Sequence, residues 1–171
     1  RSLQSGDILI CRLADPVGRC VQVPEWMDGS VTSVDVTIVR CNVEIIRPRF
    51  LMYLLNSEET LGRVRSLIQG TTRGRISRSK LGELPLTIPR SLEIQDSIIS
   101  ILDNLDSLIT VKRTLITKLG YIREGILNDL LSYGIDETGV LRSPDTHDFK
   151  PSNLGQIPIN WCCCRLDEIA T

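Results

Sequence analysis

The side chains best suited to bind a ligand are basic and lie between residues 63 and 80. This stretch carries six basic side chains and no acidic one, although the 171-residue chain as a whole has a formal charge of −1. Clustered positive charge on a nearly neutral chain is a local feature, and it attracts phosphate groups. A solvated basic surface without a partner is the plain alternative, because surface arginines are common. The six residues are Arg63, Arg65, Arg73, Arg75, Arg78 and Lys80.

Cysteine and histidine, the other residues suited to chemistry, are not arranged for catalysis or metal binding. The six cysteines contain no Cys-x-x-Cys pair. The adjacent side chains of Cys162–Cys164 cannot easily converge on one tetrahedral ion. His147 is the only histidine, and its polar surroundings predict a solvated loop position. We therefore expect reduced thiols in a core or strand, no metal site and no catalytic triad.

Composition and motifs narrow the class of protein. With 42% apolar residues, the chain can bury one ordinary core, with or without an extension. Aromatic residues make up 4%, which does not favour a stacking platform for single-stranded nucleic acid. The apolar runs are far shorter than the roughly 20 residues of a membrane span, and no secretory leader follows Arg1. We therefore expect a cytoplasmic protein. Phosphate-loop, dinucleotide-binding and adenine-methyltransferase motifs are missing, so we also expect a non-catalytic protein without a cofactor.

The first 46 residues predict β-structure, and helices follow. Short apolar or alternating runs at 7–11, 21–23 and 34–39 predict strands. Pro48 suits the first position of a helix, and Ser57 suits the N-cap of a second helix that we expect to end at Gly70. A basic loop is expected next, followed by a short edge segment between the prolines of residues 84–89.

Residues 91–132 predict one long amphipathic helix. Ser91 is a suitable N-cap, and Gly134 is a suitable stop. About 42 residues at 1.5 Å per residue give roughly 60 Å, more than a domain of this size can cover alone. The apolar residues keep a 3-4 spacing, but their stripe is broader than a two-stranded coiled coil requires, so we expect packing against two neighbours. The packing positions are Ile98, Ile101, Leu105, Leu108, Leu115, Leu119, Ile122 and Ile126.

The last part of the chain changes character twice. Residues 134–153 are polar, with the Gly, Pro, Ser and Asp content of a linker. Residues 154–171 resemble the opening of a further domain, in which a mixed strand would be expected at Cys162–Cys164. We therefore expect the chain to be a fragment of a longer protein.

Several short motifs occur in an order that resembles the specificity (S) subunit of type I restriction–modification systems. No single motif is distinctive, but their order and spacing extend from about residue 6 to residue 169. The motifs are Gly6–Leu9, Gly70–Arg73, Ile76–Leu81, Leu84–Pro89, Glu93–Gln95, Asp129–Ile135, Gly139–Arg142, Phe149–Lys150, Gly155–Pro158 and Trp161.

The resemblance implies an α+β fold, in which a β-rich target-recognition domain with a mixed or antiparallel sheet precedes a long, coiled-coil-like spacer helix. Residues 1–89 would be the later part of a first recognition domain, 90–133 the spacer helix, 134–153 a polar linker, and 154–171 the start of a second recognition domain. In this family the two spacer helices pack antiparallel.

The implied role is non-catalytic recognition of a bipartite site on double-stranded DNA, with docking to methylation (M) and restriction (R) subunits. Two alternatives remain open: the specificity region of a fused restriction–methylation enzyme, and a coiled-coil oligomerisation module without a DNA role. If the chain has the role of a specificity subunit, we expect these residues to contact DNA: Thr71, Thr72, Arg73, Arg75, Arg78 and Lys80.

Overall fold

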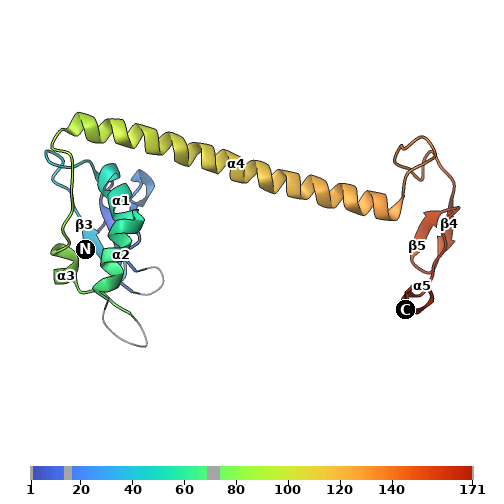
Figure 1. The fold of residues 1–171 in the computed structure, drawn as a ribbon, viewed down its shortest axis with the longest axis horizontal. Coiled ribbons are helices and arrows are strands. Elements are labelled where there is room, and N and C mark those ends of the chain that lie inside the picture. Colours follow the sequence, from blue (N-terminus) through green and yellow to red (C-terminus); the bar gives the residue numbers. More distant parts are fainter. Residues whose placement is uncertain (1, 14–16, 69–73, 171) are drawn as a thin grey trace. The chain divides into compact units, whose positions relative to one another are not determined.

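A computed structural model describes residues 2–13, 17–68 and 74–170, which adopt an α+β fold with small antiparallel sheets and one long helix (Figure 1). The chain divides into two units, Arg1–Asp106 and Ser107–Thr171, and the boundary falls inside α4 (Leu92–Ser132). None of the helices in the described ranges combines the length and apolarity needed to cross a bilayer.

The first unit is built on a three-stranded antiparallel sheet, as predicted. Strand β1 (Ile8–Cys11) lies in the centre, between β2 (Cys20–Gln22) and β3 (Val36–Val39). A 3₁₀ helix, η1 (Glu25–Met27), follows β2. Alternate residues of a strand point to opposite faces, and Ile8 and Ile10 of β1 are accordingly buried on one face.

Helices α1 (Pro48–Asn56) and α2 (Glu58–Ser66) complete the core of this unit (Figure 1). Pro48 occupies the start of α1, and the Ser57 hydroxyl accepts the N–H of Thr60 at 3.3 Å, so both predicted helix starts are confirmed. The predicted end of the second helix is wrong, because α2 stops at Ser66; Gly70 lies outside the described residues. The buried core contains Ile8, Ile10, Leu51, Met52, Leu55, Val64, Ile76 and Leu84.

The connection to the long helix differs from its prediction in two ways. A short helix, α3 (Arg78–Gly82), forms where a loop was expected, and Ser77 caps it by accepting the N–H of Lys80 at 3.2 Å. No strand forms within the described residues 84–89, so the predicted edge segment is wrong. Leu84 instead packs into the core, which anchors this segment without a ladder.

The long helix α4 has 41 residues, and both of its predicted ends are confirmed. The Ser91 hydroxyl accepts the N–H of Ile94 at 3.4 Å. At the other end, Gly134 has a φ of +68° and donates its N–H to the Leu130 carbonyl at 3.1 Å. Glycine is favoured there, because other residues rarely adopt this left-handed conformation.

The second unit continues from α4 into a hairpin. Strands β4 (Phe149–Ser152) and β5 (Gly155–Pro158) pair antiparallel, so residues expected in a linker form a strand. A four-residue helix, α5 (Leu166–Ile169), follows. The described residues Cys162–Cys164 lie outside any strand, contrary to the prediction, and their thiols are free and exposed. The predicted domain boundaries remain predictions.

Candidate nucleic-acid interface

Arginines from distant parts of the sequence meet where β1 ends and β3 begins. Arg12 directly follows β1, and its backbone N–H donates to the carbonyl of Asp35, just before β3, at 2.9 Å. Leu13 forms an isolated bridge with Arg75, and the N–H of Ile76 donates to the Arg12 carbonyl at 3.0 Å. These backbone contacts bring the segment before α3 against the end of the sheet.

The side chains at this junction line an open depression. Its five described lining residues are Arg12, Val34, Arg75, Ser77 and Arg78, of which three are arginines and none is acidic. Arg75 forms an ion pair with the nearby Asp35 carboxylate at 2.8 Å. One negative charge against three positive charges leaves the depression positive.

Arg12 has an unusual environment for a cation. Arg12 is buried, with 8% of its surface exposed. Its guanidinium donates a hydrogen bond to the Val34 carbonyl, and its Nε is buried without a hydrogen-bond partner among the described residues. Burial lowers the pKa of Arg12 below its ordinary value, because it disfavours the charged form. The positive charges of Arg75 and Arg78 lower this pKa further, whereas Asp35 acts in the opposite direction.

The structure places only part of the predicted DNA-binding set at this depression. Arg75 and Arg78 line it, whereas Lys80 lies on α3 and is not among the lining residues described. Thr71, Thr72 and Arg73 lie outside the described residues. The sequence analysis missed Arg12, although an arginine directly after an apolar strand was a usable signal.

The rest of the basic stretch lies on α2 and is paired with acids. Arg63 forms an ion pair with Glu59, and Arg65 pairs with Glu58 at 3.2 Å. The basic stretch is therefore not one uniform surface, because neighbouring acids partly neutralise its first two arginines.

The first turns of α4 are fastened to the sheet-bearing unit by a buried glutamine. Gln95 is fully buried, and its amide nitrogen donates to the carbonyls of Ile45 at 3.0 Å and Pro89 at 2.9 Å. Its amide oxygen accepts the backbone N–H of Arg47 at 2.9 Å. One side chain thus satisfies three backbone groups at the start of the helix.

A second polar cluster joins α1 to α4 farther along the helix. The Tyr53 hydroxyl lies 2.6 Å from a carboxylate oxygen of Asp103 and 2.7 Å from one of Asp106. Arg49 pairs with Asp103 at 2.7 Å. Burial raises the pKa of Tyr53, and the hydrogen bonds to the two carboxylates raise it further. The Tyr53 hydrogen bond lowers the pKa of Asp103; burial opposes this effect, and Arg49 supports it.

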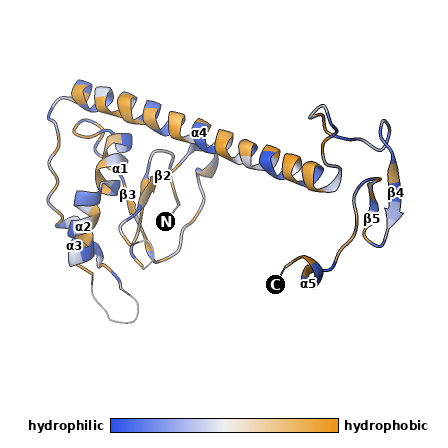
Figure 2. Cartoon of the chain, turned by 45° about the vertical axis from the view of Figure 1, so that its right-hand side comes forward, coloured by the Kyte–Doolittle hydropathy of each residue, from blue (hydrophilic) through white to orange (hydrophobic). Residues whose placement is uncertain are grey.

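The predicted packing positions of α4 are largely exposed. Figure 2 shows hydrophobic residues recurring along this helix. Ile98 is partly buried, but the other seven positions are between 49% and 62% exposed. A contiguous apolar surface of this kind is typical of an interaction site. The packing role therefore remains a prediction. The seven positions are Ile101, Leu105, Leu108, Leu115, Leu119, Ile122 and Ile126.

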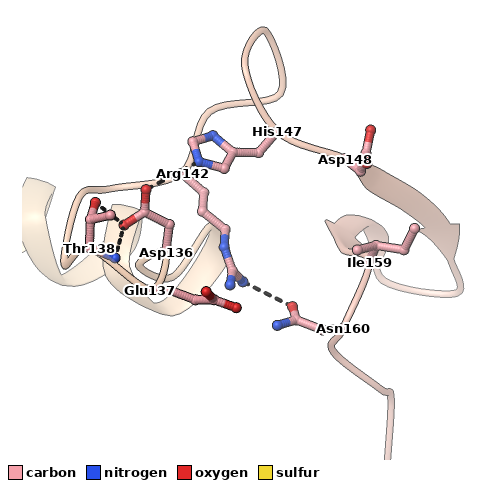
Figure 3. Close-up of a pocket in the computed structure, with 8 residues that line it drawn as sticks. All are labelled: Asp136, Glu137, Thr138, Arg142, His147, Asp148, Ile159 and Asn160. Atoms are coloured by element: carbon pink, nitrogen blue, oxygen red, sulfur yellow. Dashed lines mark hydrogen bonds and ion pairs between the residues drawn. The ribbon is translucent and has the colours of Figure 1, made fainter.

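His147 lines a pocket in the second unit (Figure 3). The Asp136 carboxylate accepts hydrogen bonds from the hydroxyl and N–H of Thr138 and the N–H of Val140. The Thr138 hydroxyl is the main cause that lowers the pKa of Asp136 to about 2. The Nε2 of His147 lies 3.5 Å from this carboxylate, and the His147 side chain is 28% exposed. His147 is therefore partly buried and contacts Asp136 within the loop, so the prediction of a solvated position is wrong.

The same pocket is bordered by a contact between the loop and the residue pair that follows β5. Arg142 donates to the side-chain oxygen of Asn160 at 2.9 Å, and both residues line the pocket (Figure 3). Within the described part of the chain, no group of three or more histidine, cysteine, aspartate or glutamate side chains is placed to hold a metal ion. These contacts stabilise loops, and the arginine depression remains the best candidate for a ligand.

Comparison with known proteins gives consistent matches. The family model described as "Type I restriction modification DNA specificity domain" matches residues 11–121. The chain is 27% identical over 128 residues to the HindI specificity subunit of Haemophilus influenzae, a match that covers 74% of this chain and 28% of the relative. It is 26% identical over 141 residues to the MjaVIII specificity subunit of Methanocaldococcus jannaschii, which covers 82% of this chain and 30% of the relative.

A solved structure has a similar fold. The HsdS subunit from Thermoanaerobacter tengcongensis matches with a TM-score of 0.60 at 22% identity, over 84% of this chain and 37% of the other. At this level of identity the likeness concerns the fold alone. The chain spans less than a third of the length of the two curated relatives.

Proposed function

This chain belongs to the type I restriction–modification DNA specificity domain family, and from that premise we propose that it recognises double-stranded DNA without catalysing a reaction itself. One observation carries the proposal most directly: a positive depression lies on a unit that is fastened by Gln95 and Tyr53 to a long helix. Phosphate contacts hold a protein in register on a duplex, and a rigid helix gives that contact a fixed relation to other parts of a complex.

The helix supplies the second half of the proposed role. Its 41 residues, at about 1.5 Å each, extend over roughly 60 Å, which approaches two turns of B-DNA at about 34 Å per turn. As spacer, α4 sets the separation of two recognition domains, which residues 1–89 and 154–171 partly supply. Its uncovered apolar stripe is suited to an antiparallel second spacer helix, and the complex would include methylation and restriction subunits.

The DNA role is tested with the arginines of the depression. Arg75→Ala combined with Arg78→Ala is expected to weaken binding of a random duplex and to flatten its dependence on salt. Each lost phosphate contact lowers the slope of log affinity against log salt by about 0.9, so we expect a drop of about 1.8. Fluorescence anisotropy at several salt concentrations measures this slope.

Two exposed basic residues of α4 provide the matched control, because Arg113→Ala with Lys118→Ala removes the same charge at residues that do not line the depression. We expect that control to retain most of the slope. An unchanged slope in the double mutant of the depression would exclude these arginines from the DNA interface. A chain that assembled through α4 but bound no duplex at low salt would favour the alternative of an oligomerisation module, which the exposed stripe also supports.

A further inference from the structure

We propose that Arg12, Arg75 and Arg78 form a pocket for a single phosphate group of the DNA backbone, in which Asp35 is a displaceable internal counter-ion. This inference rests on the proposed DNA-binding function and adds a site and a means of adjusting its strength. Arg12 was not among the residues that the sequence singled out.

Charge and geometry are the first argument. Three arginines line one open depression: Arg12 follows β1, Arg75 lies just before α3, and Arg78 begins α3. Guanidinium groups bind phosphate oxygens with two hydrogen bonds at once, so converging arginines favour a phosphate over a simple halide ion. The Ser77 hydroxyl also lines the depression; it accepts the N–H of Lys80 and keeps its own hydrogen for donation.

The incomplete pairing of Arg12 is the second argument. A buried cation is normally paired and fully hydrogen-bonded, because removing it from water is costly. Arg12 instead has a buried Nε without a partner among the described residues, and it lies beside two further cations. A bound anion would compensate this positive charge at the place where the fold does not.

Asp35 gives the pocket its proposed regulation. Its carboxylate pairs with Arg75, but the side chains of Asp35 and Arg75 are 37% and 50% exposed. Exposed ion pairs contribute little to stability, so a phosphate can compete with Asp35 for Arg75. Asp35 also repels an incoming phosphate. The acid therefore limits the strength of backbone contacts that carry no sequence information, which restrains binding at wrong sites.

The decisive experiment is Asp35→Asn in the full 171-residue chain, with binding to a random duplex measured by anisotropy at fixed salt. We expect the affinity to rise about fivefold. The matched control is Glu59→Gln, which also removes one exposed acid that pairs with an arginine, in this case on α2. The control is expected to change affinity less than about twofold, because exposed charges away from the contact are screened.

A double-mutant cycle tests whether Asp35 acts through Arg75. In an Arg75→Ala background, the gain from Asp35→Asn is expected to fall to less than half of its value in the parent chain. An affinity that is unchanged or reduced in Asp35→Asn would overturn the proposal. A gain that persists in full without Arg75 would overturn the counter-ion role.

The pocket has a readout that does not depend on DNA. The side-chain N–H signals of Arg12, Arg75 and Arg78 are followed by NMR during titration with inorganic phosphate, and Arg90 serves as an exposed reference. We expect the Arg12 signal to shift and the Arg90 signal to stay. Arg12→Lys, which keeps the charge at this buried position, is expected to abolish the phosphate response of Arg75 while the NMR spectrum remains that of a folded chain.

The two proposals fail in different ways. If the duplex binds with the expected salt dependence but phosphate and Asp35→Asn have no effect, the pocket is wrong and the DNA function stands. If phosphate shifts Arg12 but no duplex binds, the pocket takes a free phosphate, and its assignment to the DNA backbone is overturned.

Discussion

Single side chains hold the two functional parts of the first unit together, and Gln95 is the clearest case. Its side chain is fully buried and bonds to the backbone at residues 45, 47 and 89. Each of these backbone groups lies in a connection that has no ladder to satisfy it. A residue in this position fixes where the long helix begins relative to the sheet.

Gln95→Ala is expected to destabilise the first unit by about 3 kcal/mol, because three backbone groups lose their partner in a buried setting. Chemical denaturation followed by circular dichroism measures this loss in the free energy of unfolding. Asn104→Ala on the exposed side of the same helix is the control, with an expected change within about 0.5 kcal/mol. Equal effects of the two substitutions would contradict the anchoring role of Gln95.

At the scale of elements, features that depend on local chemistry were predictable from the sequence. Ser57, Ser91 and Gly134 act as helix caps through contacts within a few residues, and all three were identified in advance. Strands β1 and β3 are rich in β-branched residues, and β1 alternates between buried and partly buried positions. Both features are local signals.

Elements whose pattern is weak or whose contacts are distant were not predictable. Strand β4 contains Lys150 and Pro151 and has little of the alternation of apolar and polar residues that marks a strand, so its sequence predicted a linker. Helix α3 is too short to show a period. The candidate site was predictable only in part, for the same reason. Arg75 and Arg78 lie in a basic stretch of the sequence, whereas Arg12 is brought to them only by backbone pairing at the end of the sheet.

The apolar stripe of α4 permits a prediction at this same scale. Leu119 is 54% exposed in the chain by itself, and Leu119→Asp is expected to abolish association with a partner helix, because a charge would be buried in the interface. Co-purification with partner subunits and light scattering of the chain measure association. Lys118→Asp, at the adjacent position outside the stripe, is the control and should still associate; a Leu119→Asp chain that associated equally well would remove this position from the interface.

At the scale of the whole molecule, the proposed role as a spacer depends on stiffness at the place where the recognition unit meets α4. A long helix transmits a fixed geometry only if its first turns do not pivot on the domain that contacts DNA. Two contacts separated by about two to three helical turns resist pivoting far better than one, and the chain provides them at Gln95 and at the Tyr53 cluster. We infer that Gln95 fixes the start of the helix and that Tyr53 fixes its direction.

Tyr53→Phe tests this division of roles. Without the hydroxyl, the carboxylates of Asp103 and Asp106 lose the group that lies between them, so we expect a loss of about 1–2 kcal/mol in stability and a looser junction. The looser junction is measured as a broader distribution of distances between spin labels on the sheet and on α4 before residue 106. Tyr121→Phe is the matched control, because this tyrosine is 74% exposed on the same helix. A spacer requires that the distribution broaden in the first variant and stay narrow in the second; equal widths would mean that core packing alone sets the direction of the helix.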